Sequence, residues 1–103
     1  MKALRKMDYE SNVKRIVKAI MKQGMDMFGN CVVHMSEALG QEVMANYRKY
    51  LNGIDALLSK RGWRDEDGVK WYYSVTDMHH ESNVDKDEGC YCLIFYLEEE
   101  YIS

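Results

Sequence analysis

The spacing of apolar residues changes once along this chain, near Gly62, and that change constrains the fold more than any other feature. Before Gly62, apolar residues recur every three or four positions, which is the spacing of one face of an α-helix. After it, aromatic and β-branched residues alternate with polar ones or run together, which is typical of β-strands. Helices followed by strands indicate an α+β fold.

The first predicted helix covers about residues 10–27. Either Asp8 or Ser11 could cap its N-terminus, because both side chains accept hydrogen bonds from backbone N–H groups. The Gly-Asn pair at 29–30 is a turn signal that ends the helix. The triplet 31–33 is β-prone, and it is either a short strand or the entry to the next helix. The apolar face of the helix consists of Val13, Ile16, Val17, Ile20 and Met21.

The second predicted helix covers about residues 35–61 and carries the strongest periodic signal in the chain. Ser36 is its expected N-cap, and two basic residues followed by a glycine at 60–62 are typical of a helix C-terminus. Each glycine lowers helix propensity by about 1 kcal/mol. A break near Gly40 or near Asn52-Gly53 therefore stays open.

Two strands are predicted after Gly62, at 69–76 and 89–97, with a polar loop at 77–88 between them. The second strand is apolar on both faces, as expected of a central strand. Strands that follow each other in sequence with one loop between them most simply pair antiparallel. We predict a single domain over residues 1–103. Its two main helices pack on a C-terminal antiparallel β-hairpin, or on a small three-stranded sheet that includes 31–33, in a winged-helix-like order.

The charges are divided unevenly along the chain. Residues 1–61 carry eleven Lys or Arg against six Asp or Glu, whereas residues 62–103 carry three against eleven, for a net charge of −3. Such a division suggests a charged partner or head-to-tail self-association. Tyrosine and methionine each occur eight times, and both residue types are enriched in interface cores. These features favour a protein that acts by binding other proteins.

No motif in the sequence indicates catalysis, a cofactor or a metal centre. The chain lacks G-x-S-x-G, H-E-x-x-H, Walker A and dinucleotide-binding glycine motifs. Cys90 and Cys92 lie in an apolar strand, which favours packed thiols over zinc ligands that would act with His79 and His80. Cys31, with a histidine three residues on, is better placed for exposure, but that pair has no local signature. We expect a protein that is not an enzyme.

Three observations predict a cytoplasmic location. The charged start, residues 1–6, does not open into the apolar stretch of a signal peptide. The longest apolar run, residues 90–97, is far shorter than the ~20 residues that span a bilayer. Three cysteines are an odd number, which favours reduced thiols over a disulfide framework.

The favoured function is that of a small non-enzymatic regulator or inhibitor, able to form a homodimer, that acts through protein–protein contacts. Its acidic hairpin loop and exposed aromatic side chains would dock on a basic partner, because opposite charges steer and orient association. The candidate partner-binding residues are Tyr72, Asp77, Glu81, Asp85, Asp87, Glu88, Tyr91, Glu98, Glu99 and Glu100.

The alternative function is that of a winged-helix-like DNA-binding transcription regulator. In this interpretation a basic stripe on the first helix contacts phosphates, and the later part of 35–61 reads bases in a groove. The acidic loop at 77–88 opposes the alternative, because in the wing position it would face phosphates. The candidate nucleic-acid-binding residues are Lys14, Arg15, Lys18, Lys22, Asn46, Arg48 and Lys49.

Overall fold

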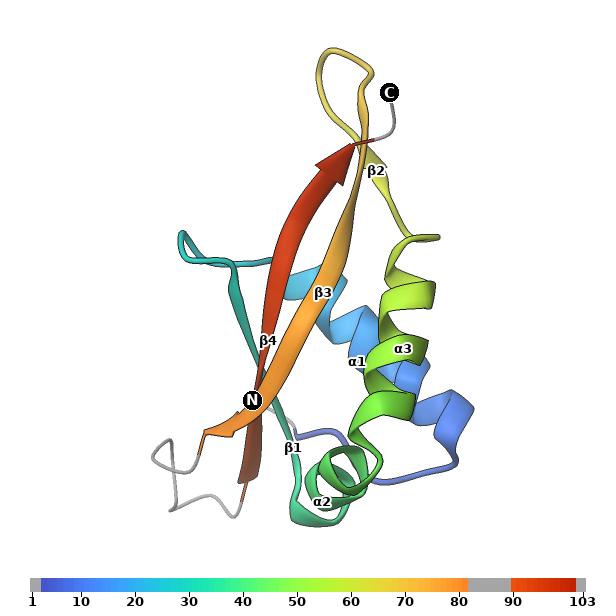
Figure 1. The fold of residues 1–103 in the computed structure, drawn as a ribbon, viewed down its shortest axis with the longest axis vertical. Coiled ribbons are helices and arrows are strands. Elements are labelled where there is room, and N and C mark those ends of the chain that lie inside the picture. The colour runs from blue at the N-terminus through green and yellow to red at the C-terminus, as the bar shows by residue number, and fades with distance from the viewer. Residues whose placement is uncertain (1–2, 82–89, 102–103) are drawn as a thin grey trace.

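A computed structural model describes residues 3–81 and 90–101 of the chain and has the α+β fold that the change of periodicity predicts. Helices pack against one face of a four-stranded antiparallel sheet (Figure 1). The elements are α1 (Tyr9–Gln23), β1 (Asn30–Ser36), α2 (Glu37–Ala45), α3 (Tyr47–Leu58), β2 (Trp63–Arg64), β3 (Lys70–Glu81) and β4 (Cys90–Tyr101).

The sheet has the strand order β1-β4-β3-β2, so the apolar C-terminal strand β4 is central, as its sequence predicts. β1 pairs with β4 along its whole length, which confirms the triplet 31–33 as part of a strand. β3 pairs with β4 and has a bulge between Val75 and Asp77. β2 is a two-residue strand that the sequence pattern does not predict. The winged-helix order expected from the sequence is not established by this arrangement.

α1 begins and ends at residues that suit the two ends of a helix. The Asp8 carboxylate accepts a hydrogen bond from the Ser11 backbone N–H at 2.9 Å, which makes Asp8 the N-cap. The helix ends at Gln23, four residues before the end of the predicted range 10–27. Gly24 follows with φ 71°, in the left-handed region that glycine adopts readily at helix ends.

The single helix predicted over 35–61 is wrong, because the structure has two helices that meet at Asn46. There the backbone leaves the helical region, with φ −118° and ψ 41°. The Asn46 side-chain amide donates to the Glu42 carbonyl at 2.9 Å, and such local bonds compete with the helical ladder. Neither Gly40 nor Gly53 breaks a helix.

The polar loop predicted at 77–88 is wrong for its first residues. β3 continues to Glu81 and β4 begins at Cys90, so the first five residues of this stretch are strand. Residues 82–89 lie outside the described part of the chain. The acidic run 98–100, expected to follow the second strand, is part of β4. Backbone pairing between β3 and β4 tolerates these polar side chains because antiparallel strands can face water.

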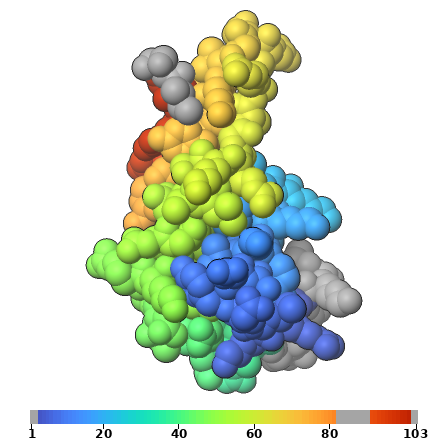
Figure 2. Space-filling model, turned by 90° about the vertical axis from the view of Figure 1, so that its right-hand side faces the viewer, coloured from blue at the N-terminus to red at the C-terminus, as the bar shows by residue number. Residues whose placement is uncertain are grey.

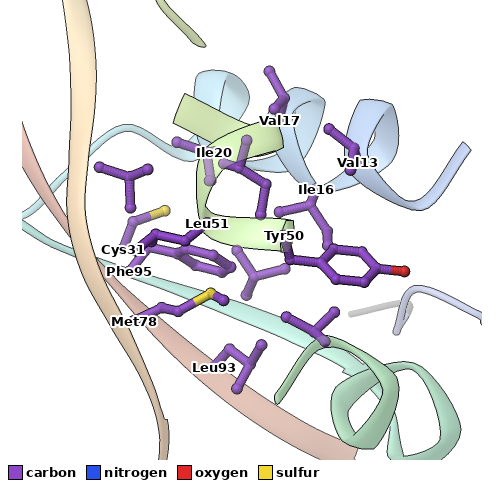
Figure 3. Close-up of a cluster of buried hydrophobic side chains, with 14 of the residues drawn as sticks. Val13, Ile16, Val17, Ile20, Cys31, Tyr50, Leu51, Met78, Leu93 and Phe95 are labelled. Atoms are coloured by element: carbon purple, nitrogen blue, oxygen red, sulfur yellow. The ribbon is translucent and has the colours of Figure 1, made fainter. Parts of the chain in front are cut away.

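The hydrophobic core lies between the sheet and the helices α1 and α3 (Figure 3). Among the described residues, Asn12 is the one buried polar side chain, and its amide donates to the Tyr50 hydroxyl at 3.1 Å. Both the apolar face predicted for the first helix and the alternate residues of β4 are buried here. The core includes Val13, Ile16, Val17, Ile20, Cys31, Leu51, Ile54, Met78, Leu93 and Phe95.

Candidate functional site

The β3–β4 hairpin extends past the helices and forms one end of the molecule, which we call the projecting end (Figure 1). It consists of residues 63–73 and 98–101, which contain β2, the turn after it, the start of β3 and the end of β4. The molecule measures 43 Å along its longest axis, against 26 and 20 Å along the others. The helices leave most of this end uncovered, and most of its residues are exposed.

Aromatic side chains pack against one another at the projecting end. The ring centroids of Trp63 and Tyr73 are 4.6 Å apart, and those of Trp71 and Tyr101 are 5.3 Å apart. Both distances lie in the range where tilted or edge-on aromatic pairs attract. Tyr101 is nevertheless 63% exposed. The projecting end therefore presents an ordered aromatic surface to solvent.

Asp65 holds the turn between β2 and β3. Its carboxylate accepts a hydrogen bond from the Trp71 indole N–H at 2.8 Å. It also accepts from the backbone N–H groups of Asp67 and Val69, each at 2.9 Å. These bonds to the charged form, the indole bond foremost, hold the pKa of Asp65 below its usual value. One side chain thus fixes both the turn and the neighbouring indole ring.

Three consecutive carboxylates, Glu98 to Glu100, are exposed at the end of β4. The Tyr72 hydroxyl donates to Oε2 of Glu100 at 2.7 Å across the β3–β4 pair. This hydrogen bond raises the pKa of Tyr72. No lysine or arginine within the described residues forms an ion pair with any of the three carboxylates. Their negative charge is therefore not neutralised within that part of the chain.

The structure separates the predicted partner-binding residues into two groups. Tyr72 and the run 98–100 lie at the projecting end, whereas Glu81 and Tyr91 lie at the opposite ends of the same strands. Nine positions along β3 separate Tyr72 from Glu81, which is about 30 Å at ~3.3 Å per residue. The residues that lie outside the described part of the chain are Asp85, Asp87 and Glu88.

Asp77 and Tyr91 make contacts within the protein. The Tyr47 hydroxyl donates to the Asp77 carboxylate, and this bond foremost lowers the pKa of Asp77. The Tyr91 ring stacks on His80, with centroids 3.7 Å apart and planes 8° apart. Tyr91 also packs against Gly40, where an added Cβ would come within 2.0 Å of the ring. Burial raises the pKa of Tyr91. These two residues stabilise the fold.

The basic stripe predicted on the first helix is present on α1. Lys14, Lys18 and Lys22 are exposed, and none forms an ion pair with a carboxylate of the described residues. Arg15 is half-buried, and its guanidinium donates to the Asn12 side chain at 2.8 Å and to the Arg5 carbonyl. The stripe therefore combines three lysines exposed to solvent with one arginine in a fixed position.

Two of the three residues predicted to read bases contact other residues of the protein. Asn46 donates to the Glu42 carbonyl. The Lys49 ammonium lies 4.4 Å from the centroid of the Tyr9 ring, and the Tyr9 hydroxyl donates to the Lys49 carbonyl at 3.0 Å. Arg48 is exposed. α3 also supplies core side chains and packs against both α1 and β3.

The expectation that Cys31 is well placed for exposure is wrong. Cys31 is fully buried on β1, and burial raises the pKa of its thiol to about 11. His34 lies on the other face of β1, where its Nδ1 is 3.2 Å from the Sγ of Cys92. His79 has its Nδ1 2.7 Å from the Tyr96 hydroxyl. Among the described residues, no three His, Cys, Asp or Glu side chains form a group that could hold a metal ion.

Sequence reasoning missed several residues that build the projecting end. The two-residue β2 is too short to show a period, so its role as a support for the start of β3 cannot be read from the pattern. The only sequence signal for these residues is the polar turn before the strand predicted at 69–76. An Asp that is followed by a glycine often accepts hydrogen bonds from the backbone of its own turn. The missed residues are Trp63, Asp65, Trp71 and Tyr101.

Comparisons with known protein families, with curated proteins and with solved structures find no match to this chain. No helix among the described residues is long and apolar enough to cross a membrane. The functional interpretation therefore depends on the geometry and charge of two surfaces. These are the acidic aromatic surface of the projecting end and the basic surface along α1.

Proposed function

We propose that this protein is a small non-enzymatic regulator or inhibitor that binds a basic protein partner through its projecting end. One observation carries the proposal: the end of β4 presents the exposed Tyr101 together with three exposed carboxylates, Glu98 to Glu100, that no described cation neutralises. Aromatic side chains supply buried contact area at interfaces, and unpaired charges set orientation and association rate. A partner with lysines or arginines around an apolar pocket matches both properties.

The order of the projecting end supports this proposal. The Asp65 carboxylate holds the Trp71 indole, and the Tyr72 hydroxyl holds the Glu100 carboxylate. Trp71 in turn packs against Tyr101. Side chains that are already fixed lose less conformational entropy when a partner binds, so more of the contact energy appears as affinity.

The proposal includes a cytoplasmic location. Cys31 is a free thiol that is fully buried in the fold. Buried reduced cysteines are ordinary in a reducing compartment, whereas secreted small domains more often use cysteines in disulfides.

Two charge-matched variants test the proposal. Glu98→Gln/Glu100→Gln removes two carboxylates from the projecting end, and Glu10→Gln/Glu37→Gln removes two exposed carboxylates from the helices. Each protein is immobilised, and the partner captured from the native host is quantified by mass spectrometry at low and high salt. We expect the first variant to capture about tenfold less of a basic partner, and the second to match the wild type.

Salt provides the second criterion of this test. Capture by the wild type should fall as ionic strength rises, because surface charges are screened over about 8–10 Å at physiological salt. Capture that is equal for the wild type and both variants, at every salt concentration, would contradict the proposal.

A further inference from the structure

A cavity of about 700 Å³ is lined by residues of the N-terminal segment and of α1, and we call it the basic hollow. Both segments, coloured blue, lie on the face of the molecule shown in Figure 2. Four of its seven lining residues are basic and none is acidic. The basic ones are Arg5, Arg15, Lys18 and Lys22, and the others are Ala3, Leu4 and Met7. In a chain with a net charge of −3, such a concentration of positive charge is a local property of this surface.

The N-terminal wall of the basic hollow is held in place by hydrogen bonds. Leu4 donates its N–H to the His34 carbonyl at 3.1 Å and accepts from the Ser36 N–H at 2.7 Å, along the outer edge of β1. The buried side chain of Asn12 accepts from the Met7 N–H at 2.8 Å and donates to the Met7 carbonyl at 3.0 Å. The hollow is thus a feature of the folded structure.

Arg15 is positioned for an anion by its own hydrogen bonds. Its Nε donates to the Ser11 carbonyl at 3.3 Å, and its Nη2 donates to the Asn12 side chain and to the Arg5 carbonyl. All these acceptors are neutral, although the Asp8 carboxylate is close enough to Arg15 for the two charges to attract each other. Arginine guanidinium groups fixed in this way suit phosphate, because their donors match its oxygens.

The spacing of the cations suits a chain of anions. Arg15, Lys18 and Lys22 fall within about 60° on the helix surface and span about 10 Å along its axis, at 1.5 Å and 100° per residue. A nucleic-acid strand carries a phosphate at every nucleotide, so successive phosphates can each meet a cation of this row. A single small anion would leave part of the row unused.

We propose that the basic hollow binds the phosphate backbone of a nucleic-acid strand without reading its bases. Phosphate contacts position a strand but carry no sequence information. Asn46 and Lys49, which could have read bases, contact the protein itself. This site does not depend on the projecting end, whose carboxylates would repel a strand and keep it along α1.

Fluorescence anisotropy with a labelled twelve-nucleotide single strand tests the site. Four cations predict a slope of log affinity against log salt near −3, so affinity should fall about 50-fold between 50 and 200 mM salt. Lys18→Ala/Lys22→Ala should weaken binding about tenfold at 50 mM salt and reduce the slope by about 1.4. Both lysines are exposed, so the variant should fold, which thermal unfolding checks.

The control variant Lys60→Ala/Lys70→Ala removes the same net charge from residues outside the hollow, and we expect its affinity to match the wild type within about twofold. Three results would overturn the proposal. The first is no binding by the wild type at 50 mM salt, and the second is an equal loss in both variants. The third is a mononucleotide that binds as tightly as the strand, which would indicate a site for a single phosphate group.

Discussion

β3 and β4 are covered by helices along part of their length and exposed to solvent at the projecting end. The residues of β4 show this difference within one strand. Leu93, Phe95 and Leu97 are at most 4% exposed beneath the helices. The next three residues, Glu98 to Glu100, remain in the same backbone ladder but face solvent. Strand pairing satisfies the backbone in both places, so helix coverage alone decides which side chains the strand can carry.

This contrast suggests that stability and binding are divided between the two regions. The helix-covered part buries the apolar side chains that drive folding. The projecting end buries little and is ordered by hydrogen bonds and aromatic pairs. Substitutions in the first region should therefore change the free energy of unfolding, and substitutions in the second should change binding.

The largest effect should come from Phe95→Ala, compared with Tyr101→Ala. Phe95 is fully buried on β4, so its truncation leaves a cavity and should lower the free energy of unfolding by about 3–5 kcal/mol. Tyr101 is 63% exposed, and its truncation should cost about 1 kcal/mol or less. Urea unfolding measures both. Similar losses would mean that the projecting end contributes to the stability of the whole domain, and the division would be wrong.

Asn12→Ala should have the next largest effect, about 2–3 kcal/mol. The Asn12 side chain bonds to both backbone groups of Met7 and to the Tyr50 hydroxyl. Its loss would leave the Met7 groups without these partners, while the Tyr50 hydroxyl would keep its bond to Glu42. Tyr50→Phe is the control, because it removes the hydroxyl with its bonds to Asn12 and Glu42 but keeps the ring and both bonds between Asn12 and Met7; it should cost about 1 kcal/mol. Urea unfolding that shows no difference between the two variants would argue against Asn12 as the link between core and N-terminal segment.

Two glycines, one in each region, allow a third comparison. A Cβ at Gly40 would meet the Tyr91 ring, and overpacking of this kind costs about 1–3 kcal/mol. Gly68 has φ 80° and nothing within 4 Å of an added Cβ, so Gly68→Ala should cost about 1 kcal/mol of backbone strain alone. Thermal unfolding of the two variants tests this order. A larger loss for Gly68→Ala would mean that the turn matters more to the fold than the α2–β4 contact.

The sequence predicted those features that depend on neighbours in the chain. Asp8 and Ser36 cap their helices as expected, because an N-cap acts on backbone groups two or three residues away. The apolar face of α1 is buried as its period predicts, with Met21 only partly buried. The position of β4 in the centre of the sheet also followed from its being apolar on both faces.

The features that the sequence did not predict depend on distant contacts. The helices meet at Asn46, where there is no glycine. The two glycines suspected of breaking the helix, Gly40 and Gly53, instead leave space for a tyrosine side chain from another element. The polar end of β3 is strand because β4 supplies its backbone partners. Tyr72 and Glu81 lie far apart because the strand that joins them is long. Local sequence pattern does not show this distance, so it could not show that the predicted acidic residues belong to two separate surfaces.

The smallest effect concerns pH and is confined to the projecting end. In the folded protein the pKa of Asp65 is lowered, so the stabilisation from its carboxylate is fully present above the unfolded pKa of about 3.9 and is lost as pH falls through the folded value. Trp63 and Trp71, the two tryptophans of the chain, both lie in this region, so tryptophan fluorescence reports on it alone. We expect the wild-type fluorescence to change as the pH falls below about 4.

The variant Asp65→Asn keeps an acceptor for the indole N–H but has no charge to lose, so its fluorescence should vary less over this range. Far-UV circular dichroism should show similar acid transitions for both proteins, because Asp8 and Asp77 also have lowered pKa values and remain in the variant. If fluorescence and circular dichroism instead change together in both proteins, the projecting end opens only when the whole domain unfolds. The two regions would then form one cooperative unit, and the different surroundings of β3 and β4 would not imply separate stability.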